Sequence, residues 1–296
     1  MDVGIFGSAN TIDGLREDVA RAHEAGFESY WTPQVFGLDA LTAFAVVAAS
    51  VPDIRLATAV IPTYPRHPMM LAQQALTANQ ATGGRIELGI GLSHQPVVEA
   101  MWGYSFDRPL AHMRDYLTIL QALLSEGEIS HAGESVTSRG AITISAEHPP
   151  VLVAALGPKM LELTGELADG TITWMTGPTT IAEHTRPTIN AGAAAGDRPE
   201  PRVVTAVPTC ITDDVDAVTD QAETDFGFYA SLPSYRAMLE REGLDKASGL
   251  ALVGSFDQVA EGLERYVDAG ATTVVASVFG PSDDRRRTVS ELSALL

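Results

Sequence analysis

Short β-branched runs alternate with helical segments along the whole chain. Eight such runs have the apolar, β-branched composition of buried strands, and segments with helical periodicity separate most of them. This alternation is typical of parallel βαβ units, and eight units in 296 residues favour a closed (β/α)8 TIM barrel over an open sheet. The predicted strands are residues 2–7, 28–32, 54–61, 86–91, 150–155, 171–174, 202–207 and 272–278.

Between the fourth and fifth predicted strands the spacing becomes longer. Residues 94–101 and 107–124 have helical patterns, and residues 128–145, with Gly133 and Gly140 as turn residues, predict a β-hairpin insertion. No Pro/Ser-rich linker and no repeat divides the sequence. We therefore expect one α/β domain over residues 1–296, a barrel with insertion segments. Residues 179–250 suggest no function.

Charge and composition exclude several classes of partner. The net charge of −19 repels nucleic acid and anionic membranes, and no apolar run approaches the ~20 residues of a membrane-spanning helix. The N-terminus lacks a signal-peptide pattern and Cys210 is the only cysteine, so we expect a cytoplasmic protein with no disulfide. A small-molecule substrate is the expected partner.

The common catalytic signatures are also missing. The sequence has no phosphate loop ending in Gly-Lys-Ser/Thr and no Gly-x-Ser-x-Gly elbow, and Gly89-Ile90-Gly91 lacks the last glycine of the dinucleotide fingerprint. The seven histidines do not fall at paired ligand spacing, so no metal site is predicted. In a TIM barrel the active site lies at the carboxyl ends of the strands, which directs attention to the residues that follow each run.

Several segments together resemble the luciferase-like monooxygenase superfamily, most closely its coenzyme F420-dependent branch. The resemblance is dense from residue 1 to about 178 and thin afterwards, although GSFDQV (254–259) resembles the start of a late helix in the family. It implies a luciferase-like barrel that carries out hydride chemistry with a deazaflavin. The segments that carry it are EAGFESYWT (24–32), RLATAVIP (55–62), RHP (66–68), GGRIELGIG (83–91), ALGPKM (155–160) and ELADG (166–170).

The resemblance assigns cofactor contacts to the third and fourth predicted strands. It implies a non-proline cis peptide at Ala59–Val60 beneath the central ring of F420, with Ile61 beside it. The small side chain of Ala59 leaves room for a ring against the main chain. An ordinary buried strand end is the alternative. Gly91 and Ser93, at the end of the fourth strand, are further implied contacts.

Residues 156–160 (Leu156, Gly157, Pro158, Lys159 and Met160) are the expected phosphate site of the cofactor. Gly157 allows close approach of the main chain, Pro158 suits a first helical turn, and free N–H groups at a helix start attract anions. Lys159 either adds positive charge or is solvated. A plain strand-to-helix turn is the alternative.

Three polar residues are candidates for binding or proton transfer. Arg66, followed by His67, either meets the anionic tail of the cofactor or pairs with a local carboxylate. His94, after Ser93 and before Gln95, either exchanges protons with the substrate or caps the next helix. Gln34 follows Pro33 where many F420-dependent relatives have Asp-His, and an amide hydrogen-bonds but neither gives nor takes a proton at neutral pH.

Two further features concern the substrate. Residues 176–178 read Thr-Gly-Pro where sugar-phosphate dehydrogenases of the family have Thr-Ser-Gly before a lysine, which argues against a sugar-phosphate substrate. The aromatic-rich stretch of Met101, Trp102, Tyr104 and Phe106 either lines an apolar pocket or packs in the core. The alternatives to an F420-dependent oxidoreductase are an FMN-dependent monooxygenase and a non-catalytic deazaflavin-binding barrel. By similarity, a homodimer is expected.

Overall fold

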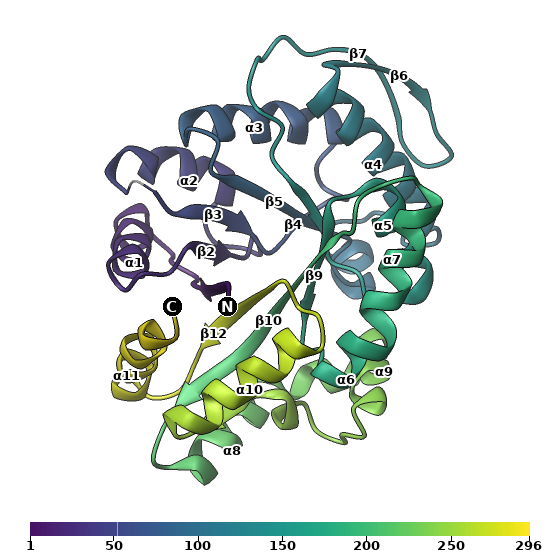
Figure 1. The fold of residues 1–296 in the computed structure, drawn as a ribbon. Coiled ribbons are helices and arrows are strands. Elements are labelled where there is room, and N and C mark those ends of the chain that lie inside the picture. The colour runs from purple at the N-terminus through teal and green to yellow at the C-terminus, as the bar shows by residue number, and fades with distance from the viewer. Residues whose placement is uncertain (52) are drawn as a thin grey trace.

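The computed structural model describes residues 1–51 and 53–296. Its parallel strands form a closed ring in the order β10-β12-β1-β2-β3-β5-β8-β9, and β9 pairs with β10 to close it (Figure 1). The predicted (β/α)8 TIM barrel is confirmed, and each predicted strand overlaps one ring strand. The ring strands are β1 (Val3–Phe6), β2 (Ser29–Thr32), β3 (Arg55–Thr58), β5 (Ile86–Gly91), β8 (Val151–Val153), β9 (Gly170–Trp174), β10 (Arg202–Ile211) and β12 (Thr273–Val278).

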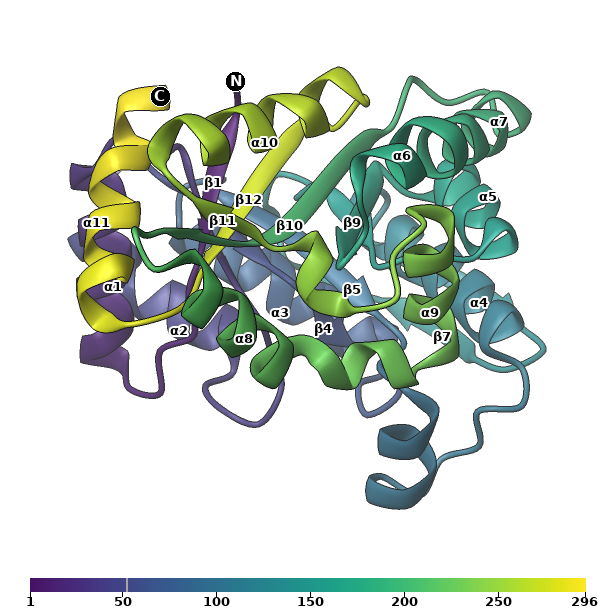
Figure 2. The same ribbon diagram turned by 90° about the horizontal axis from the view of Figure 1, so that it is seen from below.

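Helices surround the ring, and the two chain ends lie close together outside it (Figures 1 and 2). Capping residues explain several boundaries: the Thr11 hydroxyl accepts from the Gly14 amide, and Ser255 and Gln258 form a capping box. The helices are α1 (Ile12–Glu24), α2 (Ala40–Val47), α3 (Pro68–Ala81), α4 (Pro109–Ser125), α5 (Pro158–Leu167), α6 (Pro178–Thr180), α7 (Arg186–Ala195), α8 (Val215–Phe226), α9 (Pro233–Arg241), α10 (Phe256–Asp268) and α11 (Ser282–Leu292).

Two segments differ from their prediction in detail. The expected strand 54–61 stops at Thr58, and the chain resumes pairing as the short β4 (Ile61–Pro62). The segment 181–195, whose sequence pattern predicts a helix, begins with a π-helical turn at Ile181–Thr185, which apolar periodicity alone does not reveal. A second π-helical turn, Val97–Met101, lies in the predicted helix 94–101.

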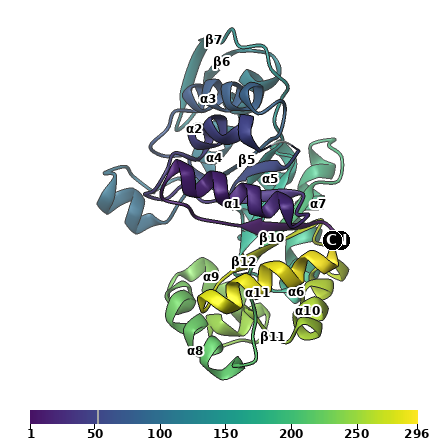
Figure 3. The ribbon, with the colours of Figure 1, turned by 90° about the vertical axis from the view of Figure 1, so that its left-hand side faces the viewer.

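The insertions lie on two sides of the barrel. The predicted hairpin forms as β6 (Glu128–Ala132) and β7 (Thr137–Ala141), which pack on α4 away from the ring (Figure 3). Helices α8 and α9 belong to a longer excursion between β10 and the short β11 (Leu252–Gly254), and both contact the 3-10 turn Gly227–Ser231 that joins them at one end of the barrel (Figures 2 and 3).

The core has two layers, as a barrel requires. The larger layer lies between strands and helices, and the smaller one fills the ring interior with Trp31 and the apolar side chains around it. Gly4 makes room for the Trp31 indole, because a Cβ there would lie 2.6 Å from Nε1. That Nε1 donates to the Ser29 hydroxyl at 2.9 Å, so the buried donor is satisfied.

Ion pairs close the amino-terminal end of the ring. The buried Glu87 accepts from Arg55 at 3.0 Å and pairs with Arg202 at 3.1 Å, and Arg55 also donates to Asp2 at 2.8 Å. Each charge has a partner, so none of these side chains is an uncompensated buried charge. The carboxyl ends of the strands lie at the opposite end of the barrel, which is where the active site of a TIM barrel is expected. In the described residues no helix is long and apolar enough to cross a membrane.

Candidate active site at the barrel mouth

A partly exposed apolar floor closes the carboxyl end of the ring. Its side chains pack against the inner core layer on one side and are partly exposed on the side that faces away from the ring interior. The rings of Phe6 and Trp174 stack at a centroid distance of 6.4 Å. The Trp174 Nε1 is buried and has no hydrogen-bond partner among the described residues, which leaves a donor free for a bound group. The floor consists of Phe6, Ala59, Val60, Ala154 and Trp174.

The floor contains the expected cis peptide between Ala59 and Val60. This confirms the geometry that the resemblance implied at this bond. The pairing between β3 and β5 is interrupted here, and the Thr58 hydroxyl bridges the gap. It accepts from the Gly89 amide at 2.9 Å and donates to the Gly89 carbonyl at 2.8 Å. The side chain of Thr58 thus replaces main-chain bonds that the departing strand no longer makes.

Two glycines in β5 allow the bulge to pack closely. A Cβ on Gly89 would overlap the carbonyl oxygen of Thr58, and one on Gly91 would lie 2.7 Å from Val60 Cγ2 and 3.2 Å from Ala154 Cβ. Both glycines are therefore required by the shape of the floor. Gly91, expected as a cofactor contact, lies directly behind Val60, and Ile61 is fully buried.

The predicted phosphate segment is the exposed start of α5. Gly157 is the N-cap residue and provides no side-chain cap, and Pro158 occupies the first turn. A Cβ on Gly157 would meet nothing within 4 Å, so the helix start faces open space. Within the described chain the amides of Gly157 and Lys159 have no hydrogen-bond partner. Such a helix start has the features of an anion site.

His94 lies beside the rim of the floor. Ser93 before it has φ of 64°, and this left-handed turn separates β5 from the π-helical turn 97–101. The imidazole centroid is 5.9 Å from the Tyr235 ring of α9. The His94 side chain does not cap the turn, since that turn has no side-chain cap bond. Burial lowers the pKa of His94 from its ordinary range, which makes the ring neutral at pH 7.

Gln34 and Arg66 both have intramolecular partners. The Gln34 Oε1 accepts from the Ala40 amide at 3.1 Å, so it ties the loop after β2 to the start of α2. Arg66 Nη2 donates to Asp39 at 2.7 Å, while its Nη1 is buried and meets no hydrogen-bond partner in the part of the chain that the structure describes. Burial would raise the Asp39 pKa, but hydrogen bonds from Thr42 and Arg66 hold it below its usual range. For Arg66, the pairing with a local carboxylate is what the structure shows.

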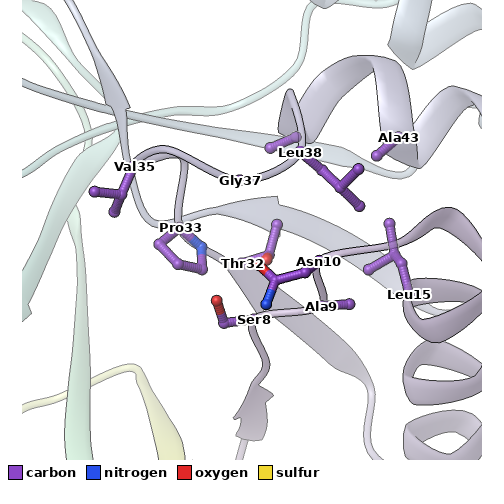
Figure 4. A pocket seen from close by; sticks show the side chains of 11 residues that line it. Ser8, Ala9, Asn10, Leu15, Thr32, Pro33, Val35, Gly37, Leu38 and Ala43 are labelled. Carbon is purple, nitrogen blue, oxygen red and sulfur yellow. The ribbon is translucent and has the colours of Figure 1, made fainter.

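A small cavity lies between the loops that follow β1 and β2, with Asn10, Thr32 and Pro33 among its lining side chains (Figure 4). Its volume of about 50 Å³ has room for a few waters at most. Val35 and Phe36 on the same loop are 62% and 66% exposed.

A second, much larger cavity of about 760 Å³ opens over the ends of β1 and β12. Phe6 contributes to both the floor and this cavity, so the two adjoin. One wall is a stripe of α8 and another is the first turn of α11. The volume lies in the range of small-molecule sites. The lining includes Phe6, Ser8, Asp214, Gln221, Asp225, Phe226, Ser277, Phe279, Asp284 and Arg285.

The β10–β11 insertion reaches the floor through a chain of aromatic contacts. Trp174 meets Phe226 at 5.7 Å and Tyr229 at 5.9 Å, and Tyr229 meets Tyr235 at 4.9 Å. Tyr235 in turn lies beside His94. The sequence analysis assigned no function to residues 179–250. The spacing of aromatic residues in short helices does not predict that they contact the end of a strand that is distant in the sequence.

The aromatic stretch 101–106 lies outside the core. Met101 and Tyr104 are 59% and 47% exposed, which makes the core-packing alternative wrong for these two residues. Tyr104 and Phe106 instead approach Tyr64, at centroid distances of 6.4 and 5.5 Å. None of the four residues of the stretch lines either cavity.

Comparison with known proteins identifies the family. The luciferase-like monooxygenase family pattern matches residues 3–273. The chain belongs to this family. A 5,10-methylenetetrahydromethanopterin reductase of Methanolobus tindarius is 28% identical over 281 residues, which cover 92% of this chain and 84% of the relative. A Mycobacterium tuberculosis protein, named as a candidate coenzyme F420-dependent oxidoreductase, is 35% identical over 57% of this chain; the match spans about half of that relative (53%).

The fold is shared with a solved structure. The coenzyme F420-dependent tetrahydromethanopterin reductase of Methanopyrus kandleri superposes with a TM-score of 0.83 over 99% of this chain and 97% of its own, at 21% identity. This likeness confirms the luciferase-like barrel. The family match makes an enzyme of the oxidoreductase/monooxygenase type the expected role of the chain.

Proposed function

We propose that this protein is an F420-dependent oxidoreductase that transfers a hydride between the deazaflavin and a small organic substrate. The observation that carries the proposal is the pairing of two features at one end of the barrel. The apolar floor, with a buried unpartnered indole N–H, suits a planar ring system, and the uncapped start of α5 suits a phosphate. Relatives whose names mention F420 support the same cofactor.

The chain supplies binding and orientation for this reaction. Bound F420 would provide the carbon that gives or takes the hydride. Ala59 and Val60 form the surface under the ring, with Gly91 behind them and Ser93 at the rim. Ile61, expected as a further contact, is fully buried in the outer core layer and supports this surface from behind. Residues 156–160 hold the phosphate through main-chain amides. Arg66 acts indirectly in this scheme, because its pairing with Asp39 fixes the loop after β4 beside the start of α2.

His94 is the proposed proton-transfer residue. Because burial lowers its pKa, the imidazole is neutral at pH 7 and can accept a proton from a hydroxyl substrate. Gln34 provides hydrogen bonding at the rim after β2. The cavity of about 760 Å³ adjoins the floor at Phe6 and offers space for the part of the substrate that extends beyond the floor, because His94 is not among the residues that line it.

Titration of the apoprotein with F420 and, separately, with FMN tests the cofactor assignment. We expect saturable fluorescence changes with F420 at micromolar concentration and much weaker binding of FMN. Binding of FMN without any response to F420 would place the protein among flavin monooxygenases, and binding of neither would overturn the proposal.

A matched histidine pair tests the role of His94. The pKa of His148 is also lowered by burial, but this side chain is more exposed than that of His94 and lies near Asp169 and Arg198 at the other end of the barrel. We expect His94→Gln to lower kcat by about 100-fold with F420 affinity unchanged, and His148→Gln to leave both unchanged. Equal rates for the two variants would remove His94 from the mechanism.

A further inference from the structure

His184 lies in the π-helical turn that joins α6 to α7. Its side chain is buried, and Nε2 is 2.8 Å from the main-chain carbonyl of Leu156. A carbonyl oxygen only accepts, so Nε2 carries the hydrogen and donates it. Leu156 immediately precedes Gly157, the residue at which α5 starts. A side chain from a different βα unit therefore fixes the peptide next to the uncapped helix start.

His184 meets this carbonyl from within the π-helical turn Ile181–Thr185. One extra residue in a turn rotates the side chains that follow it by about 100° around the helix axis. A regular helix from Pro178 to Ala195 would present a different face to the loop 154–157. The sequence carries no sign of this shift, and His184 consequently has no role in the motif-based analysis.

The helix that continues from His184 is locked against α5. A Cβ on Gly165 would overlap the carbonyl of Ile189, and one on Gly192 would overlap the carbonyl of Glu162. The two helices therefore approach main chain to main chain and pack as one unit. His184 joins the start of α5 to the start of this unit, so the position of the Leu156–Gly157 peptide is determined from both sides.

We propose that His184 is a positioning residue for the cofactor phosphate. By holding the Leu156 carbonyl it orients the following peptide, so that the free amides of Gly157 and Lys159 converge on one point in the open space before α5. This inference rests on the proposed function. In this arrangement a residue outside the segment 156–160 determines the main-chain geometry with which that segment binds the phosphate.

Paired ligands separate this role from a general structural one. F420 carries the phosphate tail, whereas its deazariboflavin core has the same ring without phosphate. We expect His184→Leu to raise the Kd for F420 by roughly three- to tenfold, the effect of one lost hydrogen bond, and to leave the Kd for the core within twofold of wild type. A loss of affinity shared equally by both ligands, or by neither, would overturn the inference.

Conservative variants keep the test decisive if His184→Leu does not fold. The Gln amide reaches as far as Nε2 and the Asn amide does not, so His184→Gln should retain F420 affinity and His184→Asn should lose it. Thr164→Val is the matched control, because it removes another buried bond in α5, from Thr164 Oγ1 to the Met160 carbonyl at 2.7 Å, and should leave both Kd values unchanged.

The same titrations distinguish failure of the inference from failure of the proposed function. If wild-type protein binds no F420, the proposed function falls and the inference falls with it. If wild type binds F420 and the Gln and Asn variants bind it equally well, the proposed function stands and His184 has no positioning role.

Discussion

Replacing Thr58 by valine tests whether its hydroxyl stabilises the fold at the point where β3 stops pairing with β5. Thr58 is fully buried, and its hydroxyl satisfies both the amide and the carbonyl of Gly89 at 2.9 and 2.8 Å. Valine has nearly the same shape, so packing is conserved and the two hydrogen bonds are lost. A buried donor and acceptor left without partners cost about 1–3 kcal/mol each. We expect Thr58→Val to lower the free energy of unfolding by about 3 kcal/mol.

Scanning calorimetry measures this loss as a fall in Tm of about 6 °C, since about 2 °C corresponds to 1 kcal/mol in a chain of this size. Thr58→Ser keeps the hydroxyl and removes only a methyl group, so it should cost about 1 kcal/mol. Thr171→Val removes a single buried bond, to the Val153 carbonyl at 2.8 Å, and should also cost about 1 kcal/mol. A Thr58→Val protein as stable as Thr58→Ser would refute the reasoning.

Three further predictions follow from the geometry. Gly91→Ala should raise the Kd for F420 about tenfold in a fluorescence titration and lower Tm by about 2–6 °C, because the new methyl meets Val60 at 2.7 Å. Burial holds the pKa of His112 at about 4, below its ordinary 6.5, so the unfolded chain gains a proton as pH falls through this window. His112→Phe should therefore reduce the loss of unfolding free energy between pH 6.5 and 4 by about 2 kcal/mol in urea titrations, with partial exposure allowed for. Gly192→Ala should destabilise by about 3 kcal/mol in the same assay because it forces α7 from α5, whereas Gly157→Ala, which meets no atom within 4 Å, should not.

The barrel could be predicted from the sequence because its strands are local signals. Each strand is a short β-branched run, and each run is bounded by turn or cap residues such as Gly26 and Pro68. The cis peptide at Ala59–Val60 was predictable only through the family resemblance, since nothing in the local composition requires it. Long-range contacts were not predictable. The bond from His184 to Leu156 joins residues 28 positions apart and depends on a π-helical turn.

The partners of polar side chains were equally difficult to predict from the sequence. The sequence allowed Arg66 to meet either the cofactor tail or a local carboxylate. Which of the two it meets depends on the position of Asp39, which lies 27 residues earlier at the start of α2. Gln34 could be identified as unable to transfer protons, but its bond to the Ala40 amide required the loop geometry. In both cases residue type defined the chemistry available, and the fold decided which partner it met.

The order of strands in the ring separates the two halves of the proposed site. The start of α5 follows β8, whereas the cavity of about 760 Å³ lies over β12 and β1, on the opposite side of the closed ring. The floor lies between them, with Val60 on one side and Phe6 on the other. A cofactor with its phosphate at α5 and its ring on the floor would thus present one edge to the cavity. The phosphate end would depend on main-chain amides and on His184, all of which lie outside the β10–β11 insertion. Helix α8 of that insertion supplies one wall of the cavity. Under the proposed function, substitutions in α8 would change the substrate while leaving cofactor binding intact.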